Sequence, residues 1–366
     1  MKNYDIAAYV WPAYTGDEPR SRIFWPEGIG EWQSVKNAEK KGDYDWGRKP
    51  LWGYVNEADP YVMEMQIEAA VDHGVNVFIY DWYWYDNRPF LENCLNDGFL
   101  KAKNNHKMKF YLMWANHDAN TLWDKRTSDM GTTIWSGQVT EEQFKIIGKR
   151  WIERYFSHPS YYRIDDKPVV SIYDMSNFIN GLGGIENARK ALIWLEEEVK
   201  AAGYKGIHVQ MIKWGGTVLN VTGVDNTANY IPMELILKEL PLDSITHYQF
   251  VHFSDMGQDY SIIGKGALQE WERAANMGKK YFPHVSVGWD NNPRYIAYHG
   301  PVVKNNPPEE FEKMLVEAKK YADEHCDTPL ITINSWNEWT ETSYLEPDNL
   351  YGYGYLEAIK RVFCGK

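Results

Sequence analysis

The stretch DPYVMEMQIEAAVDHGVNVFIY, residues 59–80, contains one complete helix-to-strand unit. Asp59 suits the N-cap of a helix, Pro60 suits its first position, and Gly74 suits the position just past its end. Four apolar residues of this window lie near helical spacing: Val62, Met65, Ala69 and Val71. The apolar run Val75 to Tyr80 then predicts a buried strand. A helix that leads through a glycine into a buried strand is typical of α/β proteins.

The same alternation of strand and helix recurs along the rest of the chain. Further helices are predicted from the capping-box sequence Thr140-Glu141-Glu142-Gln143, over 185–202 and over 308–324. Eight strands are predicted: Ile6 to Val10, Val75 to Tyr80, Lys109 to Trp114, Pro168 to Tyr173, Ile207 to Lys213, Ser244 to Phe250, His284 to Trp289 and Leu330 to Trp336. Without a linker or a repeat, this pattern predicts an α/β protein, a single (β/α)8 TIM barrel over residues 1–366. A doubly wound open sheet is the alternative.

Long connections follow several of the predicted strands, at residues 11–58, 115–139, 214–232 and 290–306. In a barrel these loops gather at the C-terminal face, where active sites are built. Many tryptophans fall in them: Trp11, Trp25, Trp32, Trp46, Trp52, Trp123, Trp135 and Trp214. Because Trp and Tyr combine a flat apolar face with a polar edge, the loops are expected to form a platform for a flat, hydroxylated ligand.

The composition excludes several classes of partner. The chain has 39 Lys and Arg against 51 Asp and Glu, a net charge of −12, which argues against sequence-independent binding of nucleic acid or anionic lipid. No run approaches the roughly 20 apolar residues of a membrane helix, so no membrane span is expected. The aromatic content of 15% stands out instead. A core rich in large side chains is the other explanation of that content.

Cysteine usage and the N-terminus bear on the compartment. Cys94, Cys326 and Cys364 are far apart and form no C-x-x-C spacing, so neither a disulfide framework nor a zinc ribbon is expected. Asp5 and Pro12 interrupt the apolar stretch that a secretory signal needs, so no export signal is expected in this chain. A chain that begins after a removed signal would look the same, which leaves the cytoplasm, the periplasm and secretion open.

The chemistry is expected just past the eighth strand, in NSWNEWTETSYLEP, residues 334–347. Glu338 and Glu341 lie three residues apart there, among Trp and Tyr. Glycoside hydrolysis needs such a pair, because one carboxyl donates a proton to the leaving oxygen while the other acts as base or nucleophile. Most E-x-x-E pairs are surface charges, but a place at the end of a predicted barrel strand favours catalysis.

The segment NSWNEWTETSYLEPDNLYGYGYLEAI, residues 334–359, resembles the signature of glycoside hydrolase family 99, the endo-α-mannosidases, and of family-99-like domains attributed to polysaccharide biosynthesis. The shared pattern is close to N-E-W-x-E followed shortly by L/I-E-P. AAYVWPAY at 7–14, FIYDWYWYD at 78–86 and MWANHD at 113–118 also resemble the family-99-like branch. The likeness therefore covers nearly the whole predicted barrel.

The resemblance implies a (β/α)8 barrel, no metal, and a retaining mechanism. It implies that Glu338 acts as base on the sugar's own 2-hydroxyl, forming an anhydro-sugar, and that Glu341 acts as acid and then as base. Thr340 and Thr342 depart from the family pattern, which has His and Gly at these positions. Both flank the acid, so the identity of the sugar and the leaving-group site stay open.

Other polar and aromatic residues near predicted strand ends are expected to contact the sugar, because its hydroxyls both donate and accept hydrogen bonds. The predicted substrate-binding residues are Tyr9, Asp81, Trp82, Tyr85, Asn116, His117, Asp118, Tyr173, Lys213, Gln249, Trp289, Asp290, Trp336, Asn337 and Glu346. Each of them can instead be a structural residue with satisfied hydrogen bonds. Trp82, Trp289 and Trp336 in particular are expected to line the pocket.

Other chemistries lack their motifs. His117 and Asp118 are adjacent, but no H-E-x-x-H or comparable spacing occurs, so no metal site is expected. Gly181-Leu182-Gly183-Gly184 lacks the order of a phosphate-binding loop and is expected to form a turn. No G-x-S-x-G elbow of a serine hydrolase occurs, and no cofactor is expected.

These observations predict a retaining glycoside hydrolase that acts on an α-mannoside or related sugar in an oligosaccharide or polysaccharide. The alternative is a glycosyltransferase of polysaccharide biosynthesis of the O-antigen type, although no basic cluster is found at a predicted strand end. A carbohydrate-binding protein without catalysis would not need both glutamates. The linkage, endo or exo cleavage and the oligomeric state stay open.

Overall fold

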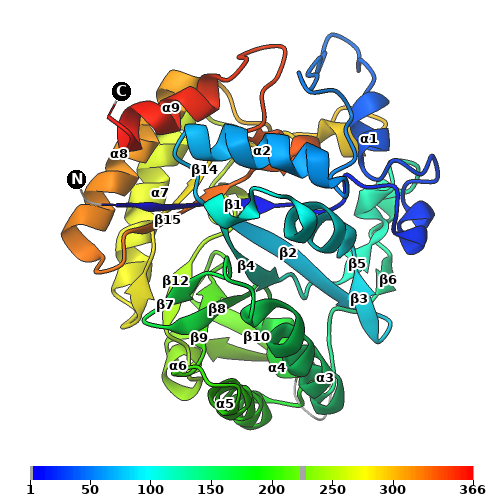
Figure 1. Ribbon diagram of the computed structural model, residues 1–366. Helices are drawn as coiled ribbons and strands as arrows, with labels where there is room; N and C mark the ends of the chain where they lie inside the picture. The colour runs from blue at the N-terminus through cyan, green and yellow to red at the C-terminus, as the bar shows by residue number, and fades with distance from the viewer. Residues whose placement is uncertain (1–2, 223–227, 366) are drawn as a thin grey trace.

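A ring of parallel strands forms the centre of the structure, a computed structural model that describes residues 3–222 and 228–365 (Figure 1). The strands of the ring are β1 (Asp5–Val10), β2 (Val77–Tyr85), β4 (Lys109–Trp114), β8 (Lys167–Ile172), β9 (His208–Ile212), β12 (Ser244–Thr246), β13 (Lys280–Tyr281), β14 (His284–Ser286) and β15 (Leu330–Asn334). Neighbours pair in the order β13-β12-β9-β8-β4-β2-β1-β15-β14. Residues 223–227 of the predicted loop 214–232, and residues 1–2 and 366, lie outside the described part of the chain.

The ring closes through an interrupted seventh strand. β13 and β14 stand at the two ends of the sheet order, yet only Phe282 and Pro283 separate them in the chain. Phe282 N donates to Ile245 O at 3.0 Å, and Pro283 O accepts from Thr332 N at 3.0 Å. Proline has no N–H for the ladder, which explains the interruption. The predicted (β/α)8 barrel is confirmed, and the open-sheet alternative is excluded.

All eight predicted strands are present, with changes at their ends. β2 is longer than predicted and folds back on the short antiparallel strand β3 (Arg88–Phe90). β12 and β14 end at Thr246 and Ser286, several residues before the predicted ends. Because the backbone leaves the ladder early, the residues that follow these two strands lie in loops at the C-terminal face rather than in the sheet.

Helices surround the ring (Figure 1). The longer ones are α2 (Pro60–Asp72), α3 (Glu141–Trp151), α5 (Ile185–Ala201), α7 (Tyr260–Ala275), α8 (Pro308–His325) and α9 (Gly354–Phe363). Shorter helices are α1 (Trp32–Lys36), α4 (Met175–Gly181) and α6 (Met233–Glu239). Between β3 and β4 the chain forms a π-helical turn, Cys94–Gly98, and a 3-10 turn, Phe99–Lys101, in place of a regular helix.

The predicted helix ends are formed by the expected residues. The Asp59 side chain accepts from Tyr61 N, and the Thr140 side chain accepts from Gln143 N. Gly74 follows α2 with φ of 92°, a left-handed conformation that favours glycine. The predicted apolar stripe of α2 was wrong, because the buried residues are Met63, Gln66, Ile67 and Ala70. Apolar periodicity missed this face because one of its members is a buried glutamine.

The loops at the C-terminal face carry small strand pairs of their own. These are β5 (Ala119–Asn120) with β6 (Thr133–Trp135), β10 (Val218–Thr222) with β11 (Ala228–Pro232), and β16 (Asn337–Glu338) with β17 (Ser343–Tyr344). At the opposite face, β7 (Arg163–Ile164) pairs with the start of β8. The two ends of the chain lie on one side of the molecule, where the rings of Tyr4 and Phe363 are 5.3 Å apart (Figure 1).

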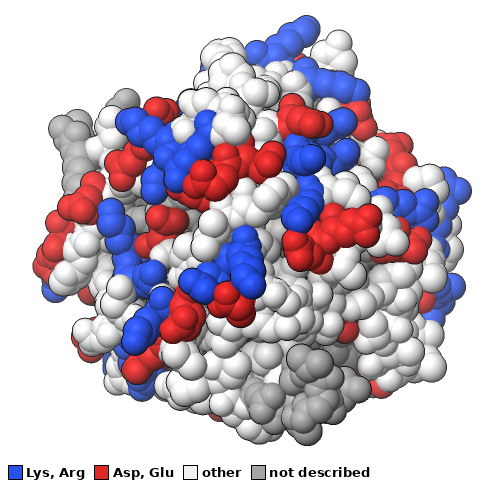
Figure 2. Space-filling model, turned by 90° about the horizontal axis from the view of Figure 1, so that it is seen from below, with Lys and Arg blue, Asp and Glu red and all other residues white. Residues whose placement is uncertain are grey.

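Charged side chains of both signs are mixed on the face seen in Figure 2, with no continuous basic area on it. This arrangement fits the negative net charge of the chain. Over residues 3–222 and 228–365, no helix has both the length and the apolar content required to cross a lipid bilayer.

Candidate active site

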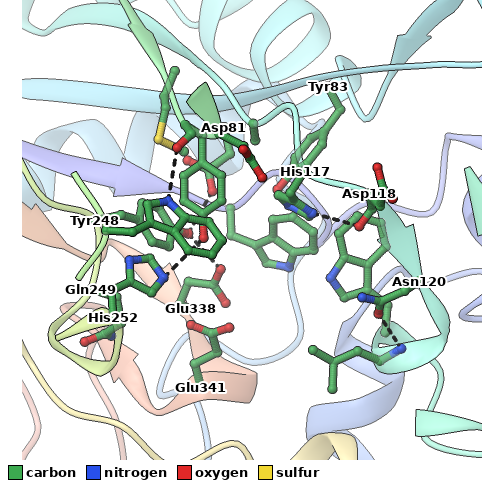
Figure 3. A pocket seen from close by; sticks show the side chains of 18 of the residues that line it. Asp81, Tyr83, His117, Asp118, Asn120, Tyr248, Gln249, His252, Glu338 and Glu341 are labelled. Atoms are coloured by element: carbon green, nitrogen blue, oxygen red, sulfur yellow. Dashed lines mark hydrogen bonds between the residues drawn. The ribbon is translucent and has the colours of Figure 1, made fainter. Parts of the chain in front are cut away.

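The chain after β15 folds into a tight hairpin that carries Glu338 and Glu341. β16 and β17 pair antiparallel, and the 3-10 turn Trp339–Glu341 joins them. Side chains three residues apart eclipse one another in 3-10 geometry. The three-residue spacing therefore places both carboxyl groups on one side of the hairpin, where they point toward one another (Figure 3).

Thr342 closes this turn in the left-handed conformation, with φ of 54°. Such a backbone is rare for a β-branched residue, and the family pattern described above has glycine here. The Thr342 hydroxyl accepts from Trp46 Nε1 at 2.8 Å and donates to Asp290 O at 2.7 Å. Asp290 N in turn donates to Glu341 O at 2.8 Å. These bonds let a threonine hold the turn that presents Glu341.

One buried guanidinium joins both glutamates. Arg294 ends the 3-10 turn Asn292–Arg294 in the loop after β14, and it is only 3% exposed. Its Nη1 donates to Glu341 Oε1 at 2.6 Å, and its Nη2 donates to Glu338 Oε2 at 3.4 Å. Its Nε donates to Glu31 Oε1 at 3.0 Å, a fully buried carboxyl from the loop after β1. Arg294 therefore offsets part of the negative charge gathered at the hairpin.

Burial raises the pKa of both glutamates. The pKa of Glu338 lies well above its ordinary value, because the carboxyl is desolvated and because Glu341 is close by. Burial also raises the pKa of Glu341, while Arg294 opposes the rise. Two buried carboxylates side by side ionise together only at a high cost, so the pair tends to hold a proton. Such a pair can act as an acid at one carboxyl and as a base at the other.

Both carboxyl groups open into a cavity of about 440 Å³ at the C-terminal end of the barrel. Eight predicted site residues line this cavity: Asp81, His117, Asp118, Tyr173, Gln249, Trp289, Glu338 and Glu341. Burial lowers the pKa of His117, so its imidazole is neutral near pH 7. Asp118 accepts from Gly137 N at 2.8 Å, which anchors the loop after β4 beside the cavity.

Trp11, Trp123 and Trp214 of the expected loop platform also line the cavity, together with residues that the sequence did not single out: Tyr83, Asp174, Asn177, Tyr248, His252 and Arg294. Strand alternation could have indicated Tyr83, because side chains two apart share a face with Asp81. Trp214 stacks on His252, with ring centroids 4.6 Å apart, and keeps 38% of its surface exposed. Burial lowers the pKa of His252 to about 3, so this ring is also neutral.

Trp82 and Tyr85 do not line the cavity. Side chains alternate along β2, so Trp82 points away from the ring, donates from Nε1 to Glu92 at 2.8 Å and packs on Trp151. The hydroxyl of Tyr85 donates to His117 O at 2.8 Å, which ties β2 to the loop after β4. Both residues therefore build the scaffold around the cavity.

Tyr9, Asn116 and Lys213 also do not line the cavity. Tyr9 is fully buried inside the ring, where its hydroxyl donates to His247 O at 3.0 Å. Asn116 exchanges two hydrogen bonds with the backbone of Asp174, at 2.7 and 2.8 Å. Lys213 Nζ pairs with Glu270, which belongs to α7. All of these residues were chosen because they lie near the ends of predicted strands. That criterion alone could not distinguish them from the residues that line the cavity.

Asp290, Trp336, Asn337 and Glu346 do not line the cavity but make contacts around the hairpin that carries Glu338 and Glu341. Asp290 accepts from Asn292 Nδ2 at 2.7 Å. Trp336 Nε1 donates to Gln66 at 3.2 Å. Asn337 Nδ2 donates to Trp11 O at 2.9 Å, and this bond holds β16 against the loop after β1. Of the three tryptophans expected to line the pocket, Trp289 does so, whereas Trp82 and Trp336 do not.

The loop tryptophans divide between the cavity and the packing of the loops. Trp11, Trp123 and Trp214 line the cavity. Trp25 and Trp32 are buried and do not line it, and Trp32 packs against Trp339 of the hairpin with ring centroids 5.9 Å apart. Both explanations of the high aromatic content therefore apply: some of the tryptophans line the cavity, and others belong to a core of large side chains.

Comparison with known families adds to this geometry. A family model described as Glycosyltransferase WbsX matches residues 6–359. The chain belongs to the WbsX family. Two curated relatives of this WbsX-family chain, both called Uncharacterized protein WxcX, come from two strains of Xanthomonas campestris pv. campestris. Each is 24% identical and is matched by 94% of this chain, which spans 47% of the relative's length.

Solved structures share the fold of the WbsX-family chain. The GH99 endo-alpha-mannosidase from Bacteroides thetaiotaomicron is similar with a TM-score of 0.55 and 14% identity, covering 100% of this chain and 98% of that one. A structure described as a glycoside hydrolase-like protein gives a TM-score of 0.60 and 14% identity, covering 99% and 94%. The WbsX-family chain therefore has a family-99-like barrel, as the sequence motifs predicted.

A second carboxyl pair lies behind the hairpin of the WbsX-family chain. Gln66 Nε2 donates to Glu346 at 2.8 Å and to Glu57 at 3.0 Å. Asn337 Nδ2 donates to Glu57 at 2.9 Å, and Trp339 Nε1 donates to Glu346. Burial raises the pKa of Glu57 to about 7 and raises that of Glu346 well above its ordinary value. The L-E-P part of the motif thus supplies a buried acid, Glu346, that holds Trp339 on one side of Glu338, while Glu57 holds Asn337 on the other side.

Glu346→Gln should make the stability of the protein less dependent on pH. A raised pKa in the folded state gives stability that is fully present below the unfolded value and is lost as the pH rises through the folded value. For Glu57 that loss runs from about pH 4.5 to about pH 7. In the variant, position 346 no longer titrates, so the part of the decline that comes from the raised pKa of Glu346 is removed, while burial still raises the pKa of Glu57. Urea unfolding at pH 5, 6, 7 and 8 should give a shallower decline for the variant; parallel curves would refute the raised pKa of Glu346.

Proposed function

We propose that this WbsX-family chain catalyses retaining cleavage of a glycosidic bond in an oligosaccharide or polysaccharide, with an α-mannoside or related sugar as substrate. The proposal rests on one observation. Glu338 and Glu341 point toward one another inside an aromatic cavity and share the guanidinium of Arg294. This arrangement supplies an acid and a base within reach of one sugar ring.

The proposed reaction needs no proton from outside the cavity in its first step. Glu338 accepts the proton of the sugar 2-hydroxyl, whose oxygen attacks the anomeric carbon and forms an anhydro-sugar. Glu341 donates its proton to the leaving oxygen as the glycosidic bond breaks. In the second step Glu341 accepts a proton from water, the water opens the anhydro-sugar, and Glu338 returns its proton to the 2-oxygen. Two inversions at the anomeric carbon give net retention.

The charge of the cavity favours a neutral sugar over a nucleotide-sugar donor. Five carboxyl groups line it: Asp81, Asp118, Asp174, Glu338 and Glu341. Among the described lining residues, Arg294 is the one Lys or Arg, and carboxyl groups already occupy it. A diphosphate needs cationic partners to replace its hydration, and this lining would repel it.

A glycosyltransferase is the second candidate, because the family is described by that activity. In that case a sugar hydroxyl would take the place of water in the second step, and Glu341 would accept the proton of that hydroxyl. Thermal stabilisation by nucleotide sugars, without an effect of oligosaccharides, would instead support a nucleotide-dependent transferase.

Glu341→Gln tests the acid. We expect the wild-type protein to cleave at least one member of a panel of α-linked oligosaccharides, with retention followed by NMR. The variant should lose about 100- to 10,000-fold in kcat on these substrates, because a proton donor is missing. The loss of kcat/KM, which reports the first step, should be much smaller on aryl glycosides, because their leaving groups depart without a proton. Equal activity of both proteins on the oligosaccharides would remove Glu341 as the acid.

A further inference from the structure

The hydroxyl of Tyr248 lies between two carboxyl groups. It is 2.9 Å from Asp81 Oδ2 and 3.1 Å from Glu338 Oε1, and all three residues line the cavity (Figure 3). Asp81 comes from β2, Tyr248 from the loop after β12, and Glu338 from β16. The barrel therefore assembles this row of three oxygens from segments that are far apart in the chain.

Both contacts of Tyr248 are hydrogen bonds only if the row contains an additional proton. A tyrosine hydroxyl has a single proton, and an ionised carboxylate can only accept. If Asp81 and Glu338 were both ionised, Tyr248 could donate to one of them, and its oxygen would face the lone pairs of the other. One carboxyl of the row must therefore carry a proton and donate it to the Tyr248 oxygen.

The surroundings assign this proton to Asp81. Asp81 is 3% exposed, none of the ion pairs of the described residues includes it, and its Oδ1 is buried without a hydrogen-bond partner there. Glu338, by contrast, contacts the Arg294 guanidinium. The other titratable or charged groups around the row are Glu31, Glu341, Tyr9, Tyr14, Tyr83, Tyr173, His117 and His252. The cation thus favours charge on Glu338, whereas no ion pair of the described residues favours it on Asp81.

We propose that Asp81 remains a neutral carboxylic acid in the working protein and donates to Tyr248, which donates to Glu338 and keeps it ionised. Asp81 and Tyr248 are then positioning residues that prepare Glu338 to accept a proton. No proton leaves the row in this arrangement, because Asp81 and Tyr248 each keep their own. The base role of Glu338 is part of the function proposed above, whereas the protonation of Asp81 is independent of it.

The pH profile of kcat/KM tests the row. Tyr248→Phe removes a hydrogen-bond donor from the Glu338 carboxylate. The acidic limb of the kcat/KM profile of this variant should therefore move up by about one pH unit, which is a tenfold loss of kcat/KM at low pH. Asp81→Asn should lower the rate but leave the limb in place, because one neutral group replaces another. A limb that moves down in Asp81→Asn would overturn the proposal, since it would mean that a negative charge had been removed beside Glu338.

Infrared spectroscopy of the wild-type protein gives a readout that needs no substrate. At pH 7, the difference between the wild-type and Asp81→Asn spectra should contain the carbonyl band of a protonated carboxylic acid, with the expected shift in heavy water. A difference spectrum with carboxylate bands in its place would overturn the assignment. Glu341→Gln is the control, because it removes an acid band that comes from a proton on Glu338 or Glu341 and leaves the band of Asp81 in place. Failure of cleavage with the acid band present would count against the proposed function alone.

Discussion

Glu338→Gln should lower kcat for glycoside cleavage about 1,000-fold and leave the protein folded. Glutamine has nearly the same shape as glutamate, but it cannot accept the proton of the sugar 2-hydroxyl. The loss should be similar on oligosaccharides and on aryl glycosides, because the base is needed whatever group leaves. This pattern distinguishes Glu338 from Glu341, whose loss should depend on the leaving group.

The same variant should be at least as stable as the wild-type protein at pH 7. Burial and the proximity of Glu341 both disfavour the charge on Glu338, and the amide carries none. Thermal unfolding of the variant beside Glu317→Gln, a substitution at an exposed position of α8, would measure this effect. A variant that unfolds at a lower temperature and keeps its activity would contradict both the base role and the charge argument.

Arg294→Met should destabilise the protein by about 3–5 kcal/mol at pH 7. The guanidinium is buried and contacts Glu31, Glu338 and Glu341. Methionine fills much of the same volume but leaves these carboxylates without a cation. Loss of one member of a buried ion cluster costs more than the cluster contributes when intact, because the remaining charges stay desolvated.

The deficit of Arg294→Met should shrink as the pH falls. Without the cation, the pKa values of the two glutamates rise further in the folded protein. The stability linked to such groups is fully present below their unfolded pKa and is lost as the pH rises through the folded value. Urea unfolding at pH 5 and pH 7.5 should therefore show the larger deficit at pH 7.5. Arg189→Met, on the exposed side of α5, is the matched control and should change little at either pH.

Much of the barrel could be predicted from local patterns. Asp59, Thr140 and Gly74 mark helix ends through bonds or backbone conformations that involve only nearby residues. The eight strands were found because each is a short apolar run. The interruption of the seventh strand at Pro283 was missed, because it can be recognised only from the hydrogen bonds to the two neighbouring strands.

The site was predicted less evenly. Glu338 and Glu341 were found because their spacing and the surrounding motif are local features. Trp82 and Trp336 were expected in the cavity, but alternation along a strand and packing behind the hairpin turn them away. Arg294 and Tyr248 carried no local signal, since the carboxyl groups that each contacts are far away in the chain, up to 263 residues for Arg294 and 167 for Tyr248.

The sequence by itself determined the order of strands and helices, the (β/α)8 class and the pair of glutamates at the last strand. These features depend on short-range periodicity, capping and spacing. The tertiary structure alone decided which side chains enter the cavity, that the Arg294 guanidinium lies between the glutamates, and which buried carboxyl groups lie close to one another. The physical reason is that burial and charge pairing are sums over neighbours from every strand of the ring, and no segment of the chain contains those neighbours.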